Sequence, residues 1–296
     1  MLEAYAGQSA SVDGGVQDDG RRLWIFSQTR FKQVDTCPER GRRSLLGLTP
    51  DGPSDSTAVG QAVHGAIELC VTDMIDGQGP WAASDMLDVA VDIFNANMAE
   101  PNARWVRVKR PETAYGFIDT CLATWRREVM PTLHPWAVEV TFGPLTVYED
   151  EQRIIQIRGQ IDYIDQITEL ADWKTSGREW EPWEHQRWDV QPTLYTLGYY
   201  LHLFGGDPDW LRDEYGWTWH VLRRDGGYQK IRTVRTPADW DWLIRRLVVT
   251  AEMLEANLPR WPLNDTSALC SPDWCPAWPD CKGAHMPDNW PLSTKG

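Results

Sequence analysis

Two acidic residues and one lysine stand in neighbouring strand-like stretches near the middle of the chain. Asp162 follows Gly159-Gln-Ile, and Asp172 and Lys174 are separated by a single tryptophan. Side chains alternate between the two faces of a strand, so Asp172 and Lys174 point to the same face. If this strand pairs with the one that carries Asp162, both carboxylates and the ammonium group meet at one edge of a sheet.

Such a set of residues suits the hydrolysis of phosphodiesters. Carboxylate oxygens hold Mg²⁺ or Mn²⁺, which binds the scissile phosphate and lowers the pKa of an attacking water. A nearby lysine orients that water or stabilises negative charge on the phosphate. The residues alone leave a plainer interpretation open, in which Asp162 caps a turn while Asp172 and Lys174 form a surface ion pair.

Hydrophobic periodicity and turn residues predict the elements that would position these side chains. The first half is helical, and a central run of strands and then further helices follow, which predicts an α/β fold. Helices are expected over residues 54–75, 82–98, 112–130, about 188–204 and 237–257, with an interrupted helical pattern over 26–48. Strands are expected over residues 137–147, 153–164, 169–173, 217–224 and 228–235.

The length of 296 residues allows one large domain or two. We predict a disordered leader over residues 1–20, one domain over 21–286 and a short tail over 287–296. No stretch approaches the roughly 18 apolar residues that span a membrane. The first residues lack the basic start and apolar run of a signal peptide. We therefore expect a cytoplasmic protein with no membrane partner.

The net charge of −14 argues against a generally basic surface that coats nucleic acid. Basic residues nevertheless gather in three stretches, over 21–43, 104–110 and 223–235. Each stretch is either a solvated surface or, together with the others, part of a path for DNA.

Three cysteines in the Pro-rich tail have the spacing of metal ligands. Cys270, Cys275 and Cys281 are separated by four and by five residues. Three thiolates at this spacing, with a fourth from elsewhere in the chain, suit a tetrahedral or cubane metal centre. Cys70 and Cys121 lie in apolar helical patterns and are expected to be core residues.

The order of these motifs resembles the PD-(D/E)xK nuclease superfamily. Its RecB-like branch, with the AddB-type and CRISPR-associated single-chain exonucleases, is the most similar. That branch has a cysteine before a proline, then a helical G-x-x-x-H, an acid, a D/E-x-K and a Q-x-x-x-Y, and a closing cysteine group. Here these are Cys37-Pro38, Gly60 to His64, Asp162, Asp172 to Lys174, Gln191 to Tyr195 and the tail cysteines, so the matches run from residue 37 to residue 281.

The resemblance implies a restriction-endonuclease-like core, which is a mixed sheet flanked by helices, and a role for each matched residue. His64, Asp162, Asp172 and the backbone carbonyl of Trp173 would be ligands of Mg²⁺ or Mn²⁺. Lys174 would be the catalytic lysine. Gln191 and Tyr195, which lie one helical turn apart, would position that lysine or the DNA strand. Glu139 is either an auxiliary acid or an exposed strand residue.

For the cysteines, the resemblance implies a [4Fe–4S] cluster held by Cys37, Cys270, Cys275 and Cys281. One departure matters: that branch commonly has two residues between the first two tail cysteines, and this chain has four. Zinc is therefore kept as the alternative. Either metal would join the N-terminal region to the tail.

The function implied is a DNA exonuclease that acts on single-stranded or free ends, with 5′ to 3′ polarity favoured. One alternative is a subunit that binds or processes DNA ends in a recombination or CRISPR-adaptation complex; a homo-oligomer is also possible. Another is a structural protein that bears the cluster without catalysis.

Four tryptophans lie in the D-x-K motif or shortly after it: Trp173, Trp180, Trp183 and Trp188. They either stack on bases or pack within the fold.

Overall fold

The computed structural model describes residues 14–48, 52–166, 169–256, 261–264, 269–271 and 274–285. The chain divides into two compact units, each assembled from separate stretches. Unit 1 contains Met1–Pro50, Pro144–Arg158 and Ile244–Gly296, and unit 2 contains Asp51–Gly143 and Gly159–Leu243. The single domain that we predicted for residues 21–286 stays a prediction.

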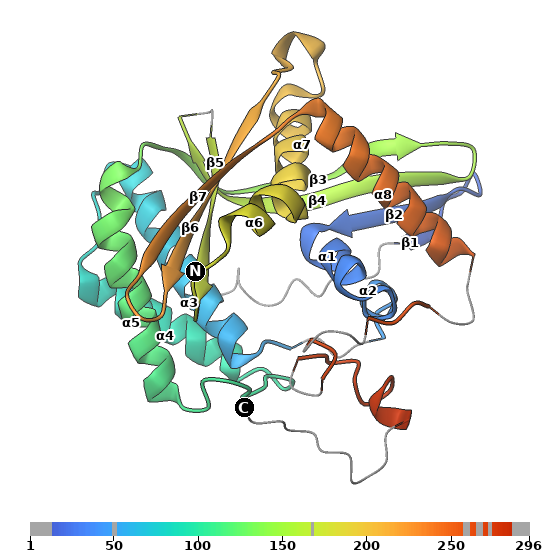
Figure 1. The fold of residues 1–296 in the computed structure, drawn as a ribbon. Coiled ribbons are helices and arrows are strands. Elements are labelled where there is room, and N and C mark those ends of the chain that lie inside the picture. The colour runs from blue at the N-terminus through green and yellow to red at the C-terminus, as the bar shows by residue number, and fades with distance from the viewer. Residues whose placement is uncertain are drawn as a thin grey trace. The chain divides into compact units, whose positions relative to one another are not determined.

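Unit 2 has a layer of three helices that pack together (Figure 1). They are α3 (Asp55–Ile75), α4 (Ala83–Met98) and α5 (Pro111–Glu128). The predicted helices at 54–75, 82–98 and 112–130 are therefore confirmed to within two residues. Small and branched residues of α3 recur at helical spacing, and Ala58, Ala62, Val63 and Ala66 are completely buried in the main hydrophobic core.

A mixed sheet forms the centre of unit 2. Its strands are β4 (Arg153–Asp165), β5 (Glu169–Ser176), β6 (Tyr215–Arg223) and β7 (Tyr228–Arg235), with β3 (Pro135–Glu149) paired to β4. β4 and β5 are antiparallel, β5 and β6 parallel, and β6 and β7 antiparallel. Both faces of β6 are buried, which explains why its sequence is largely apolar, whereas β5 buries Asp172 among its apolar residues.

Helices cover both faces of this sheet. α3 packs against β5 and α5 against β6, whereas α6 (Pro182–Trp188) and α7 (Val190–Phe204) contact β6 and β7. Alternate residues of β6 separate the two faces: Leu222 belongs to the core under α5, while Trp217 contacts Tyr195 of α7. Short 3₁₀ helices lie at Met130–Thr132 and Pro208–Trp210. The predicted α/β fold with a mixed sheet flanked by helices is confirmed.

Unit 1 pairs β2 (Arg22–Ser27) in parallel with the first half of β4. It also contains β1 (Gly14–Val16), α1 (Gln28–Thr36), α2 (Pro38–Leu45), most of α8 (Pro237–Glu255) and a 3₁₀ turn at Gly283–His285. Pro38 begins α2, and Cys37 lies between the two helices, because proline is accepted in the first turn of a helix but not in its interior.

The first twenty residues differ in part from the prediction. We expected residues 1–20 to be a disordered leader, but Gly14–Val16 forms β1 and pairs antiparallel with β2. The ladder uses backbone groups alone, so it needs no apolar pattern that the sequence would reveal. Residues 1–13 and the predicted tail at 287–296 lie outside the described residues. Among the described residues, no helix is long and apolar enough to cross a membrane.

A buried carboxylate fixes the start of α3. Asp55 is completely buried, and its Oδ2 accepts hydrogen bonds from the backbone N–H groups of Val106, Arg107, Val108 and Lys109 at 2.7–3.3 Å. Burial by itself would raise the pKa of Asp55, but these four donors lower it below the usual carboxyl range. The ionised side chain therefore ties the loop before α5 to the helix that carries His64.

We predict that Asp55→Asn lowers the free energy of unfolding at neutral pH by about 2 kcal/mol or more, because an amide cannot accept several charge-assisted bonds. A carboxyl whose pKa is depressed on folding stabilises the protein above its unfolded pKa, and this contribution is lost as the pH falls through its folded pKa. The difference in the free energy of unfolding between wild type and variant should therefore become smaller at acidic pH. Urea unfolding at several pH values measures it.

Asp85→Asn is the matched control, since Asp85 is an exposed carboxylate in the first turn of α4. Equal stability of Asp55→Asn and Asp85→Asn at neutral pH would contradict this role for Asp55.

Candidate metal centre

The structure brings together four of the predicted site residues, all in unit 2. β4 and β5 pair antiparallel with Tyr163 opposite Ala171, which places Asp162 and Asp172 next along the ladder. His64 reaches them from α3. One ligand atom from each of these three side chains lies within 4.8 Å of the others. The expected pairing of the two strands is therefore present.

Two short contacts organise this group. Nδ1 of His64 lies 3.0 Å from Oδ2 of Asp162, and Nζ of Lys174 lies 2.6 Å from Oδ2 of Asp172. The Asp172 side chain is only 1% exposed, whereas that of Lys174 remains 31% exposed. The Asp172 carboxylate is thus buried, whereas the Lys174 side chain is partly open to solvent.

The electrostatics of the two acids differ although they are neighbours. Burial raises the pKa of Asp172 well above its usual value, the charge of Asp162 adds to this, and Lys174 opposes it. For Asp162, burial also acts upward, but the neighbouring His64 and the contact with Asp172 bring its pKa below the usual range. The pKa of Lys174 is raised despite its burial, because both carboxylates favour the ammonium form.

The donor set fits a divalent cation. Apart from the Lys174 ammonium group close to Oδ2, the oxygens of the buried Asp172 carboxylate have no hydrogen-bond donor within the described part of the chain. A buried charged oxygen without such a partner is costly unless a cation binds it. Two carboxylates and one imidazole supply the hard oxygen ligands, with one nitrogen, that Mg²⁺ and Mn²⁺ accept.

Two glycines of the sequence motifs allow this close packing. A Cβ on Gly159 would lie 2.7 Å from the ring of Phe142 and 2.9 Å from that of Tyr195. A Cβ on Gly60 would lie 3.4 Å from Oγ1 of Thr175, in ordinary contact. Gly159 is therefore sterically required where α7 approaches β4, while Gly60 only eases the approach of α3 to β5.

Tyr195 and Gln191 both lie on α7, and Tyr195 is close to the acids. Burial raises the pKa of Tyr195, and the charges of Asp162 and Asp172 add to this effect. Gln191 is buried in the first turn of α7, where its backbone N–H donates to Oδ1 of Asp189 at 3.1 Å. The positioning role that we predicted for Gln191 and Tyr195 stays a prediction, as does the Trp173 carbonyl as a ligand.

Glu139 and two further acids surround the site. Burial, with the charges of Asp162 and Glu68, raises the pKa of Glu139 to about 9. Its φ of 51° is unusual for a residue other than glycine within a strand, and such strain gathers at functional sites. Glu139 is thus directed towards the acids rather than being a plain exposed strand residue, although its role stays a prediction.

Sequence reasoning missed Glu68 and Asp189. Glu68 lies one helical turn after His64, and burial together with Asp162 raises its pKa. Asp189 begins α7 and is among the acids that favour the charged form of Lys174. The i, i+4 spacing from His64 could have indicated Glu68, but Asp189 reads in the sequence as an ordinary helix cap.

The four predicted cluster cysteines belong to unit 1, and all are partly exposed. Burial raises the pKa of the Cys270 thiol, an effect that Lys282 opposes and that Cys275, Cys37 and Cys281 reinforce. Within the described residues the four thiols do not lie close enough together to form a group of ligands for a single metal ion. The tail is held onto α1 and α2 by bonds from Asn264 to the Thr36 carbonyl at 2.6 Å and from Arg43 to the Asp280 carbonyl at 3.1 Å. Cys70 and Cys121 are fully buried in the core of unit 2, as expected.

Comparison with known proteins decides the family. The family model of the PD-(D/E)XK nuclease superfamily matches residues 25–282, which is most of the chain. The chain belongs to the PD-(D/E)XK nuclease superfamily. Nucleases of this superfamily use divalent metal ions, and membership implies DNA as the substrate. No curated protein matches the sequence.

A solved structure agrees with this fold. The crystal structure of a "putative exonuclease" from Eubacterium rectale superposes with a TM-score of 0.54 and 12% sequence identity. The match covers 99% of this chain and 96% of that one. At 12% sequence identity, this likeness shows that the two chains share a fold.

Proposed function

We propose that this nuclease is a metal-dependent DNA exonuclease of the RecB-like branch. The convergence of His64, Asp162, Asp172 and Lys174 in one partly buried corner carries the proposal. The order of the sequence motifs supports the RecB-like branch. The structural neighbour, described as a "putative exonuclease", supports removal of nucleotides from ends. Single-stranded ends and 5′ to 3′ polarity are the favoured mode because of the resemblance to the single-chain members of that branch.

The side chains of this site have distinct tasks in the proposal. His64, Asp162 and Asp172 would hold Mg²⁺ or Mn²⁺, with the Trp173 carbonyl as a further ligand. When bound, such an ion polarises the phosphate and lowers the pKa of a water molecule. Lys174 stays protonated between the acids, so its ammonium group stabilises negative charge on the phosphate in the transition state. Tyr195 and Gln191 hold the lysine or the strand in position.

We also propose that Cys37, Cys270, Cys275 and Cys281 hold a [4Fe–4S] cluster, with zinc as the alternative. The sequence spacing of the cysteines and the two bonds from the tail to α1 and α2 support a shared centre. A cluster of several irons holds its thiolates farther apart than one ion does. Its physical role would be to join two ends of unit 1 that are more than two hundred residues apart in sequence, and its binding energy would add to folding energy.

We predict that purified protein shortens end-labelled DNA stepwise with Mg²⁺ or Mn²⁺ and not with EDTA. Lys174→Ala and Asp172→Ala should each lower the rate by about a hundredfold or more, since each removes a charge from the reacting phosphate or its metal ion. Asp119→Ala, which removes an exposed carboxylate on α5, is the matched control and should cut normally.

Stepwise shortening that is lost in the two site variants would also give the polarity. Cutting that persists in both variants would refute the proposed site. No cutting by wild type with any metal would favour a subunit that processes DNA ends only within a larger complex.

A second prediction concerns the cysteines. Cys275→Ala should lose bound iron or zinc and destabilise folding on the order of several kcal/mol, because metal-binding energy stabilises the fold. Metal analysis, the visible absorbance and thermal melting measure these effects. Cys121→Ala, in the core of unit 2, is the control that should keep its metal. Unchanged metal content and melting of Cys275→Ala would refute the cluster.

A further inference from the structure

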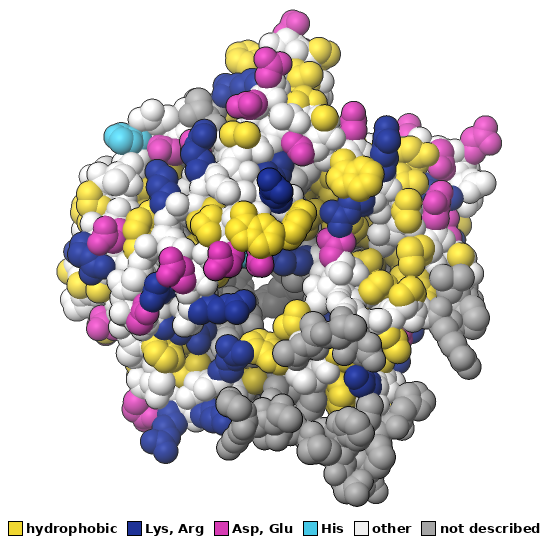
Figure 2. Space-filling model, in the orientation of Figure 1, with side chains coloured by type: hydrophobic (Ala, Val, Ile, Leu, Met, Phe, Trp, Pro, Cys, Tyr) yellow, Lys and Arg dark blue, Asp and Glu magenta, His cyan; other side chains and the backbone are white. Residues whose placement is uncertain are grey.

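The segment between Lys174 and Gln191 exposes two large aromatic rings. They are Trp183 and Trp188 of α6, which are 47% and 66% exposed. Their ring centroids are 5.0 Å apart and the rings meet at 77°, so they form one aromatic pair on the surface. In Figure 2 hydrophobic side chains are visible over α6, beside both basic and acidic ones.

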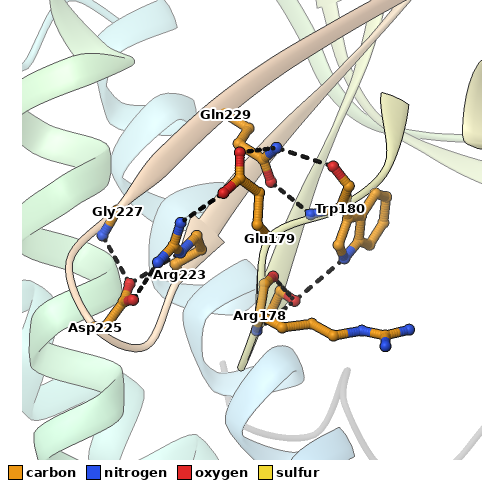
Figure 3. Close-up of polar contacts among 8 residues, drawn as sticks. Arg178, Glu179, Trp180, Arg223, Asp225, Gly227 and Gln229 are labelled. Atoms are coloured by element: carbon orange, nitrogen blue, oxygen red, sulfur yellow. Dashed lines mark hydrogen bonds and ion pairs between the residues drawn. The ribbon is translucent and has the colours of Figure 1, made fainter. Parts of the chain in front are cut away.

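The chain before α6 is firmly anchored to the sheet (Figure 3). The backbone N–H of Trp180 donates to Oε1 of Gln229 at 2.8 Å, and Nε2 of Gln229 donates to the Trp180 carbonyl at 3.1 Å. The indole N–H of Trp180 also donates to Oγ of Ser176 at 3.2 Å, at the end of β5. α6 therefore starts from a fixed point, directly after the strand that carries Asp172 and Lys174.

A different side of α6 supplies its contacts with the fold. His185 stacks on Trp180 with centroids 3.8 Å apart and meets Trp219 edge to face. Nε2 of Gln186 donates to the Arg232 carbonyl at 2.8 Å. These contacts hold the helix through His185 and Gln186 and leave the aromatic pair outside. Exposing so much indole surface is unfavourable in water, and contiguous exposed apolar surface marks binding sites.

The surface around the pair carries both basic and acidic side chains. Arg187, next to Trp188, is exposed, and Arg178 extends its guanidinium away from the network in Figure 3. Of the neighbouring acids, Glu179 is paired with Arg223 at 3.5 Å. Glu181 and Glu184 remain exposed, so the surface is mixed in sign. Such a surface gains more from stacking than from general attraction of phosphates.

We propose that Trp183 and Trp188 form a stacking platform for an unpaired base of the strand that enters the metal centre. The inference rests on the proposed nuclease function and names the form of DNA that the site prefers. The position of α6 supports it, because this helix follows the strand that carries Asp172 and Lys174 and leads directly into α7, which carries Gln191 and Tyr195. A base inside a duplex has both faces covered by its neighbours, whereas an unpaired base offers its faces to aromatic rings.

The test compares binding of a fluorescein-labelled single strand in EDTA, by fluorescence anisotropy, for wild type and Trp183→Ala/Trp188→Ala. The double variant should bind on the order of tenfold more weakly, as expected for loss of base stacking. Trp210→Ala is the matched control, since Trp210 is 56% exposed elsewhere in unit 2 and should not matter. Trp183→Phe/Trp188→Phe should restore most of the affinity.

A strand without bases at its terminal nucleotides separates stacking from contacts with phosphates. Wild type should bind this abasic strand as weakly as the double alanine variant does, and the variant should bind abasic and normal strands equally. Normal binding by the double alanine variant, or no binding by wild type, overturns the inference. Binding that depends on the pair in a protein that cuts no DNA would refute the nuclease proposal and leave the platform standing.

Discussion

Two neighbouring carboxylates share a buried corner of the sheet, and their mutual repulsion is the constraint on which the site depends. Asp162 and Asp172 come from paired antiparallel strands, next to the pair of Tyr163 and Ala171, so the ladder holds their backbones side by side. Positive charge must therefore be brought to them. Lys174 supplies it from the same strand as Asp172, and His64 contacts Asp162 from α3. A divalent cation would complete the balance, which is why the fold suits metal-dependent chemistry.

Several distant features of unit 2 serve this corner. Asp55 fixes the beginning of the helix that carries His64, and Gly159 lets the ring of Tyr195 approach β4. Further acids, Glu68 and Glu139, surround this corner, and burial together with the charge of Asp162 raises the pKa of both. The site is thus held by the packing of the surrounding elements, and its acids favour a bound cation more than any single pair would.

Much of this arrangement could be predicted from the sequence. Helical periodicity gave α3, α4 and α5, and the D-x-K spacing placed Asp172 and Lys174 on one face of a strand. β1 was missed because its ladder relies on backbone groups. α6 was missed because its apolar residues, Trp183 and Trp188, face outward. Glu139 was ambiguous because its direction depends on an unusual φ, which alternation along a strand does not predict.

The acidic net charge limits how the protein can hold DNA, since acidic and basic side chains are interspersed on the face in Figure 2. On the proposed account, the affinity for DNA comes from the metal centre and from base stacking.

Diffraction from crystals soaked in Mn²⁺, recorded at the manganese absorption edge, tests most directly whether His64, Asp162 and Asp172 hold a metal ion. The account predicts an anomalous peak bound by His64, Asp162 and Asp172, and its loss in Asp172→Asn. Ordered side chains without a peak there, or a peak that persists in the variant, would contradict it.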